Sequence, residues 1–307
     1  MTFLQIDFPA LLVAVLAALA AALVGNILVL RRQALMGDAL SHMVLPGIVA
    51  GYLISGSAHS WALVAGALAA GLIGAGLIAA ARRLGGLDPA TAMGVVLTAL
   101  FAGGVLMLEL SNTGNVHLDV EHALYGSLES AIWLYPNVWT DIFDPAGWAE
   151  LPREAPLLAG ALLLLGIAFL AAFKEIALVA FDPDYAAALG LPGWISDLLI
   201  NAAAAIAVVA AFDAVGSILV IAMLICPAAT ARLLTNSLAA QVWASLGIAV
   251  GLAVGGYGLG VWAAPALGAP AALNAAGSMA VAGGAALGLA AAWRARLNRR
   301  RGRVLPG

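Results

Sequence analysis

Nine long apolar runs constrain the fold of this chain more than any other feature. They are residues 10–30, 40–54, 61–81, 91–110, 156–173, 195–211, 218–234, 242–264 and 271–293. The runs are about 15 to 23 residues long, and a helix needs roughly 20 apolar residues to cross a bilayer. Strands of a membrane barrel would be shorter and would alternate in polarity. The runs therefore predict an all-α integral membrane protein. Pro46 and Pro227 interrupt the second and seventh runs, so a bundle of either eight or nine helices fits.

The composition excludes a soluble protein. Of 307 residues, 64% are hydrophobic and 9% are charged, whereas soluble domains carry about 25% charged residues. No linker or second domain interrupts the sequence, so residues 1–307 form one transmembrane domain. The only basic cluster is the C-terminal tail, which fits a membrane surface better than nucleic acid. The sequence contains no phosphate-binding loop, so we expect that this chain is not an enzyme that hydrolyses ATP.

The basic residues predict how the chain crosses the membrane. Those that follow alternate spans are Arg31, Arg32, Arg82, Arg83, Lys174, Arg232 and the six arginines of residues 294–303. Placing all of them in the cytoplasm requires an outside N-terminus, an odd number of crossings and a cytoplasmic C-terminus. Residues 111–155 then form an outer loop, and half of the 16 acidic residues lie between Glu109 and Glu154. This acidic loop either attracts cations or is acidic only because the basic residues stay inside.

Asp38 and His42 are ionisable residues in the motif that opens the second run. Their spacing of four residues places both side chains on one face of a helix. Carboxylate and imidazole together suit Mn, Fe and Zn, whereas Ca and Mg prefer oxygen ligands. Two ligands do not complete a shell, which suits a transport site that must release its ion. The structural alternative is that Asp38 caps the helix and His42 makes a hydrogen bond.

Two weaker candidates for metal binding accompany this pair. The outer loop contains His117, Asp119, Glu121 and His122. These residues could receive metal from a carrier, or they could belong to a solvated loop. Asp213 lies between two apolar runs and either lines the pathway or belongs to a loop.

The amphipathic segment of residues 174–192 lies between two spans, on the side predicted to be cytoplasmic. Asp182 and Pro183 should begin a short helix there, and Gly190 can end it. Such a helix fits a groove on a partner, although a helix in the membrane interface is equally compatible. Small-residue spacing also predicts helix contacts at two sets of glycines. These are Gly71, Gly74 and Gly76, and Gly247, Gly251 and Gly255.

Four segments together resemble the metal-ion permeases of bacterial ABC importers for manganese, zinc and iron. They are residues 37–42 with 45–47, 114–119 with 124–126, 181–190, and 216–220 with 227–232. The likeness covers nearly the whole chain. His59, Trp61 and the region from Trp133 to Trp148 match none of these motifs.

The resemblance implies a type II ABC-importer permease in the inner (plasma) membrane of a bacterium. It implies a second permease chain (a copy or a paralogue), a cytoplasmic ABC ATPase and an extracytoplasmic metal-binding protein. Asp38 and His42 would be metal ligands for a transported Mn, Zn or Fe ion, with no permanently bound cofactor. ATPase coupling maps onto Phe181, Asp182, Pro183, Asp184, Tyr185 and Gly190.

Two other functions are compatible with the residues themselves. A secondary transporter driven by an ion gradient would use Asp38, His42 and Asp213 as a proton relay. A non-transporting membrane scaffold would bind no metal at these positions.

Overall fold

A computed structural model of the chain describes residues 3–56, 61–111, 126, 128–136, 138–266, 268 and 273–302. Nine helical segments within these residues are long and apolar enough to cross a membrane. They are α1 (Phe3–Leu30), α2 (Met36–Met43) with α3 (Leu45–Ser55), α4 (Trp61–Gly85), α5 (Pro89–Leu110), α8 (Glu154–Ala171), both halves of α11 (Gly193–Leu234), α12 (Leu238–Tyr257) with its continuation to Ala266, and α14 (Ala275–Gly302). The all-α membrane fold is therefore confirmed, with nine candidate spans.

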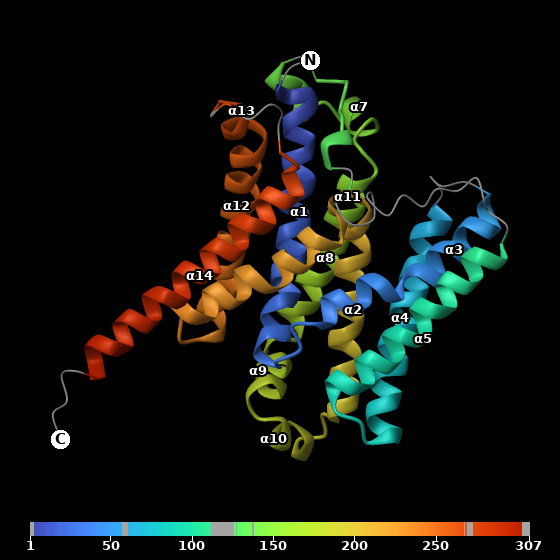
Figure 1. Cartoon of the computed structure of the whole chain (residues 1–307), viewed down its shortest axis with the longest axis vertical. Helices are drawn as coiled ribbons and strands as arrows, with labels where there is room; N and C mark the ends of the chain where they lie inside the picture. The colour runs from blue at the N-terminus through green and yellow to red at the C-terminus, as the bar shows by residue number, and fades with distance from the viewer. Residues whose placement is uncertain are drawn as a thin grey trace.

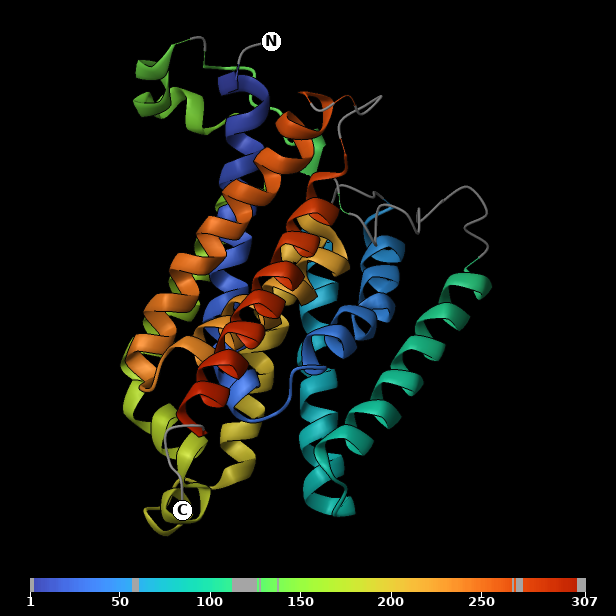
Figure 2. The ribbon, with the colours of Figure 1, turned by 60° about the vertical axis from the view of Figure 1, so that its left-hand side comes forward.

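The helices form two groups joined by α11 (Figure 2). In the first group, α1 packs on α8 and α12, and α12 packs on α14. In the second group, α2, α3, α4 and α5 pack on one another. Among the described helices, only α11 packs extensively on members of both groups. A movement of one group relative to the other must therefore involve α11.

Small and polar side chains hold the first group together. Gly25 of α1 lies so close to α11 that a Cβ atom there would be 1.8 Å from the backbone oxygen of Leu224. The buried Asn26 side chain donates a hydrogen bond of 2.6 Å to Ser245 and accepts one of 3.1 Å from Gln241, both on α12. Close backbone approach and hydrogen bonds between helices provide the packing energy that the hydrophobic effect cannot supply within lipid.

The glycine predictions are correct in part. A Cβ atom on Gly71 would lie 3.2 Å from Ala205, and one on Gly74 would lie 3.1 Å from Met43, whereas no atom lies within 4 Å of such an atom on Gly76. The prediction for α12 is wrong within the described chain, because a Cβ atom would meet nothing within 4 Å at any of the three glycines that the spacing singles out. These are Gly247, Gly251 and Gly255. The face of α12 that packs inward is instead the buried row Gln241, Ser245, Ala249 and Ala253.

The tightest helix contact in the second group joins α3 to α4. A Cβ atom on Gly47 would lie 2.0 Å from the carbonyl oxygen of Gly66, and one on Gly66 would lie 2.1 Å from the carbonyl oxygen of Gly47. One turn further along α3, a Cβ atom on Gly51 would lie 2.3 Å from the carbonyl oxygen of Ala62. The backbones of the two helices therefore touch directly.

One predicted helix break is present and the other lies elsewhere. The second span is interrupted at Val44, and Pro46 occupies the first turn of α3. Pro227 lies inside α11, whereas the backbone of α11 leaves helical geometry at Gly216, with φ 71° and ψ 167°. Glycine adopts this conformation at little cost. Gly126 packs against the break, because a Cβ atom there would lie 2.5 Å from the nitrogen of Gly216.

The basic residues gather at one end of the bundle, as their alternation predicts. Arg31 and Arg82 both contact Asp197 near the start of α11, and Arg83 stacks on Trp194. At the same end, Arg232 lies over the ring of Phe181. In Figure 1 this end is the lower one, where α9 (Phe173–Phe181) and α10 (Pro183–Ala188) are found. The N-terminal end of α1 lies at the opposite end.

Exposed tryptophans mark both ends of the bundle. Seven of the eight are exposed: Trp61, Trp139, Trp148 and Trp262 at the end where α1 begins, and Trp194, Trp243 and Trp293 at the basic end. Tryptophan is enriched at both interfaces between membrane and water. Their distribution fits a bundle that crosses a bilayer from one of these ends to the other.

Candidate metal site and coupling surface

Asp38 and His42 lie on the open face of α2. The opposite face is buried, with Met36, Leu40 and Met43 each no more than 1% exposed. Gly37 brings this face close to α11, since a Cβ atom there would lie 2.3 Å from the side chain of Leu224. The α2 helix is thus anchored on α11 and presents its two ionisable side chains on the other side.

The Asp38–His42 pair has a spacing suited to one shared cation. Nε2 of His42 lies 3.6 Å from Oδ1 of Asp38, which is too long for a hydrogen bond. Two ligand atoms about 2.1 Å from the same ion, at a roughly tetrahedral angle, would be about 3.4 Å apart. The side chains are 41% exposed for His42 and 47% for Asp38. A cation could therefore reach both atoms with little change in the helix.

Neighbouring contacts favour this interpretation over helix capping. The α2 helix begins at Met36, and its N-cap residue, Leu35, makes no capping hydrogen bond through its side chain. Asp38 lies inside the first turn, so it is not the cap. The His42 ring meets Phe101 of α5 edge-on, with ring centroids 5.9 Å apart. This contact limits the orientations that the imidazole can adopt.

The pair supplies two ligands within one chain. Among the described residues, no group of three or more histidine, cysteine, aspartate or glutamate side chains could hold a metal ion. The secondary candidates His117, Asp119, Glu121 and His122 lie outside the described residues. Asp213 belongs to α11, three residues before the break at Gly216, and its side chain is likewise not described.

The segment of residues 174–192 folds locally as its sequence predicts. Asp182 caps α10 by accepting a hydrogen bond of 3.0 Å from the backbone nitrogen of Tyr185. Pro183 occupies the first turn of α10. Gly190 follows the helix with φ 87°, and the backbone nitrogen of Leu191 donates to the carbonyl oxygen of Ala186 at 3.0 Å. Three large side chains stay exposed, namely Phe181, Tyr185 and Leu189. We call these three residues, together with Asp184, the coupling surface.

The region from Trp133 to Trp148, which matches no motif, folds as a cap on the start of α1. Trp133 is buried, and its indole nitrogen donates a hydrogen bond of 2.9 Å to the carbonyl oxygen of Gly147. The backbone nitrogen of Trp133 donates to the carbonyl oxygen of Gln5 at 2.9 Å. The cap includes the short helices η2 (Trp139–Phe143) and α7 (Pro145–Trp148).

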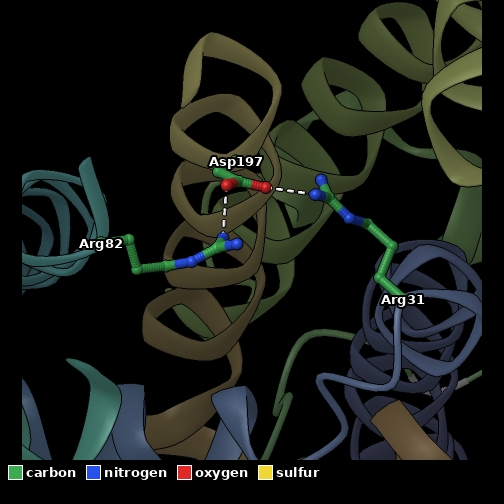
Figure 3. Close-up of polar contacts among 3 residues, drawn as sticks. All are labelled: Arg31, Arg82 and Asp197. Carbon is green, nitrogen blue, oxygen red and sulfur yellow. Dashed lines mark hydrogen bonds and ion pairs between the residues drawn. The ribbon is translucent and has the colours of Figure 1, made fainter. Parts of the chain in front are cut away.

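The structure also reveals a charged cluster that the sequence analysis missed. Asp197 accepts hydrogen bonds from both Arg31 and Arg82 (Figure 3). It is the only acidic residue in the apolar run of residues 195–211. Ionisable residues within spans are costly and commonly functional, so this isolated carboxylate was a usable signal. Arg31 and Arg82 were interpreted from the sequence only as markers of the cytoplasmic side of the membrane.

Together, these features define a class of protein. Nine candidate spans in the described part of the chain, an ionisable pair on an interrupted helix and a helical surface at the basic end describe a multi-pass membrane permease. Known proteins give a more specific result. The sequence matches the ABC 3 transport family over residues 4–132 and 153–283, so the chain belongs to this family. The unmatched stretch between these ranges, residues 133–152, includes the whole cap region from Trp133 to Trp148.

Individual relatives and a solved structure agree with this assignment. The chain is 38% identical over 249 residues to the manganese transport system membrane protein MntD of Bacillus subtilis, with 81% of each chain covered. It is 36% identical over 216 residues to the zinc transport system membrane protein TroD of Treponema pallidum, covering 70% of this chain and 56% of that protein. PsaBC from Streptococcus pneumoniae in complex with Fab matches with a TM-score of 0.69 and 25% identity, covering 92% of this chain and 90% of that one. The predicted resemblance to metal-ion ABC permeases is confirmed.

Proposed function

We propose that this chain is the membrane-spanning permease subunit of an ATP-driven importer for a divalent transition-metal ion, Mn, Zn or Fe. Relatives named for manganese and zinc transport support this cargo. The observation that carries the proposal is the spacing of 3.6 Å between His42 Nε2 and Asp38 Oδ1 on the open face of α2. Ionisable side chains within a membrane span are retained mainly where they serve a function.

Partner chains supply the energy and deliver the ion in this proposal. A cytoplasmic ABC ATPase binds the coupling surface, and an extracytoplasmic metal-binding protein delivers the ion at the opposite end. A second permease chain, either a copy or a paralogue, faces the open side of α2. The arginines around α9 and α11 support a cytoplasmic position for that end and for the C-terminus. The location is then the inner membrane of a bacterium.

Metal uptake into proteoliposomes tests the function against its rivals. The complete complex, formed with its ATPase and second permease chain, is reconstituted and supplied with Mn, Zn or Fe bound to the delivery protein. We expect uptake of at least one metal that requires ATP and continues in the presence of an uncoupler. Uptake that does not require ATP and that is abolished by an uncoupler would identify a secondary transporter. An assembled complex that transports none of the metals would support a scaffold.

Charge reversal on the coupling surface should weaken binding of the ATPase. Asp184 is exposed next to Tyr185, and Asp184→Lys changes the charge without removing the cap at Asp182. Loss of complementary charge at an interface costs about 1 kcal/mol, or roughly fivefold in the dissociation constant. Titrating purified ATPase against the permease in detergent measures this change.

A control variant separates charge from helix capping. Asp182→Asn removes a charge but keeps an oxygen that can accept the hydrogen bond from the backbone nitrogen of Tyr185, so any loss of ATPase binding in this variant reports the charge and not the cap. Truncation of an exposed aromatic at an interface centre is commonly costly, so Tyr185→Ala should weaken binding as well. Unchanged affinity in both Asp184→Lys and Tyr185→Ala would remove the coupling role from this surface.

A further inference from the structure

The cluster of Arg31, Asp197 and Arg82 is a partly buried group of charges at the basic end of the bundle, with the carboxylate buried and the two arginines partly exposed. Asp197 is 7% exposed, and each of its carboxylate oxygens accepts a hydrogen bond from a different arginine (Figure 3). Arg31 follows the end of α1, whereas Arg82 belongs to the last turn of α4. A buried charge is tolerated only when it is paired and hydrogen-bonded, so the three side chains depend on one another.

The cluster ties both helix groups to the helix that joins them. Arg31 comes from the first group, Arg82 comes from the second, and Asp197 belongs to α11. Arg83 adds a further link between the second group and α11, because its guanidinium carbon lies 4.7 Å from the centroid of the Trp194 ring. The contacts at this end therefore connect helices that otherwise meet mainly through α11.

The cluster is also connected along the chain to both the coupling surface and the candidate metal site. Asp197 is four residues after the start of α11, which follows α10 by a short turn. Arg31 begins the turn that leads into α2. Two backbone hydrogen bonds hold this turn, from Arg32 to Val29 and from Gln33 to Leu28, and Arg32 adopts φ 57°. This pattern is a defined helix ending, which gives the turn between α1 and α2 a fixed geometry. A displacement of Arg31 should therefore also displace the start of α2.

Several polar atoms in and around the cluster make no hydrogen bond to any described residue, so the arginines could form hydrogen bonds with a different partner. Nη1 of Arg31 and Nε of Arg82 are buried without a hydrogen-bond partner among the described residues. The side chain of Asn201 stands one helical turn beyond Asp197 on α11, and both of its amide atoms are also buried and unpartnered. A buried polar group in this state calls for an explanation. Its carbonyl oxygen would offer an arginine a second acceptor if α11 shifted by one turn, a movement known from other switching proteins.

We propose that Asp197, held by Arg31 and Arg82, is the positioning residue that transmits movement of the coupling surface to α2 and α4. The inference rests on the proposed function, since it concerns how the conformational change driven by ATP hydrolysis is transmitted to the metal site. Asp197 does not belong to the metal site and acts through the helices that it joins. Loss of either arginine should uncouple ATP hydrolysis from transport.

The test measures metal ions transported per ATP hydrolysed by the complete complex in proteoliposomes. Arg31→Gln and Arg82→Gln each leave Asp197 paired with the other arginine, so the fold should survive. We expect this ratio to fall about tenfold in both variants, within the range of coupling between linked sites, while ATP hydrolysis continues. Arg296→Gln removes the same charge from an exposed position on α14 and should keep the wild-type ratio.

The outcomes separate this inference from the function on which it rests. A wild-type ratio in both Arg31→Gln and Arg82→Gln, in a complex that transports metal, would overturn the inference alone. Transport and ATP hydrolysis that fall together, in proportion to the amount of folded complex, would also overturn it, because the cluster would then be purely structural. A wild-type complex that transports no metal would overturn the proposed function and this inference with it.

Discussion

Replacing Asp38 or His42 with alanine should reduce metal uptake at least about 100-fold, because loss of even an outer-shell partner of a metal commonly costs 10–100-fold in affinity. Both side chains are about half exposed, and substitutions at such positions usually change stability by no more than about 0.5 kcal/mol. The variants should therefore reach the membrane in normal amounts and assemble with their ATPase. Uptake of Mn, Zn and Fe by cells expressing the complete complex measures the effect.

A conservative variant and a folding control sharpen this experiment. Asp38→Glu keeps a carboxylate that can bind a metal, so it should retain part of the uptake that Asp38→Ala loses. Thermal unfolding in detergent should be nearly unchanged for all three variants. Normal uptake in both alanine variants, at equal membrane levels, would show that the pair does not bind the cargo. The pathway would then have to involve other residues, beginning with Asp213.

Adding a side chain at the contact between α3 and α4 should destabilise the fold strongly. In Gly66→Val the new Cβ atom would lie 2.1 Å from the carbonyl oxygen of Gly47. That neighbour is backbone, so no side-chain rotation can relieve the clash. Overpacking of a core costs about 1–3 kcal/mol of stability and occasionally more. We expect Gly66→Val to lower the free energy of unfolding by more than about 2 kcal/mol. Thermal unfolding in detergent measures the loss of stability.

The matched control lies on the same helix. A Cβ atom on Gly76 would meet no atom within 4 Å, so Gly76→Val should leave the unfolding temperature close to that of the wild type. Because α3 continues from α2, Gly66→Val should also reduce metal uptake in the molecules that do fold. Equal unfolding temperatures for the two variants would show that α3 and α4 do not touch as the structure places them.

The membrane fold was predictable because lipid imposes a simple rule on sequence. A segment that crosses the hydrocarbon core must satisfy its backbone hydrogen bonds internally and must be apolar for about 20 residues. Each of the nine runs accordingly coincides with a helical span. The local structure around Asp182 and Gly190 was also predictable, because helix starts and ends depend on residues close in sequence.

Features that depend on contacts between distant segments were not predictable in the same way. The spacing of Gly247, Gly251 and Gly255 suggests a helix contact, but the face of α12 that packs inward is the one whose Gln241 and Ser245 form hydrogen bonds with the distant Asn26 on α1. The break in α11 occurs at Gly216, where Gly126 packs closely against the backbone. A proline such as Pro227 can be tolerated inside a membrane helix, because neighbouring groups satisfy the freed backbone.

The candidate site shows the same division. Helical periodicity alone places Asp38 and His42 on one face, and their spacing in the structure agrees with it. The pairing of Asp197 with Arg31 and Arg82 joins residues up to 166 positions apart, so no local pattern contains it. A lone carboxylate in an apolar run indicates that partners exist without naming them.

Under the proposed function, binding of the ion by Asp38 and His42 on the open flank of α2 should be thermodynamically linked to the association of the two permease chains. A neighbour that covers the flank lowers the local dielectric constant and strengthens the attraction between the carboxylate and a cation. By reciprocity, a bound ion strengthens the association of the chains by the same factor. The transported ion would then stabilise the association of the two permease chains, and at low metal concentration the two chains would dissociate more readily.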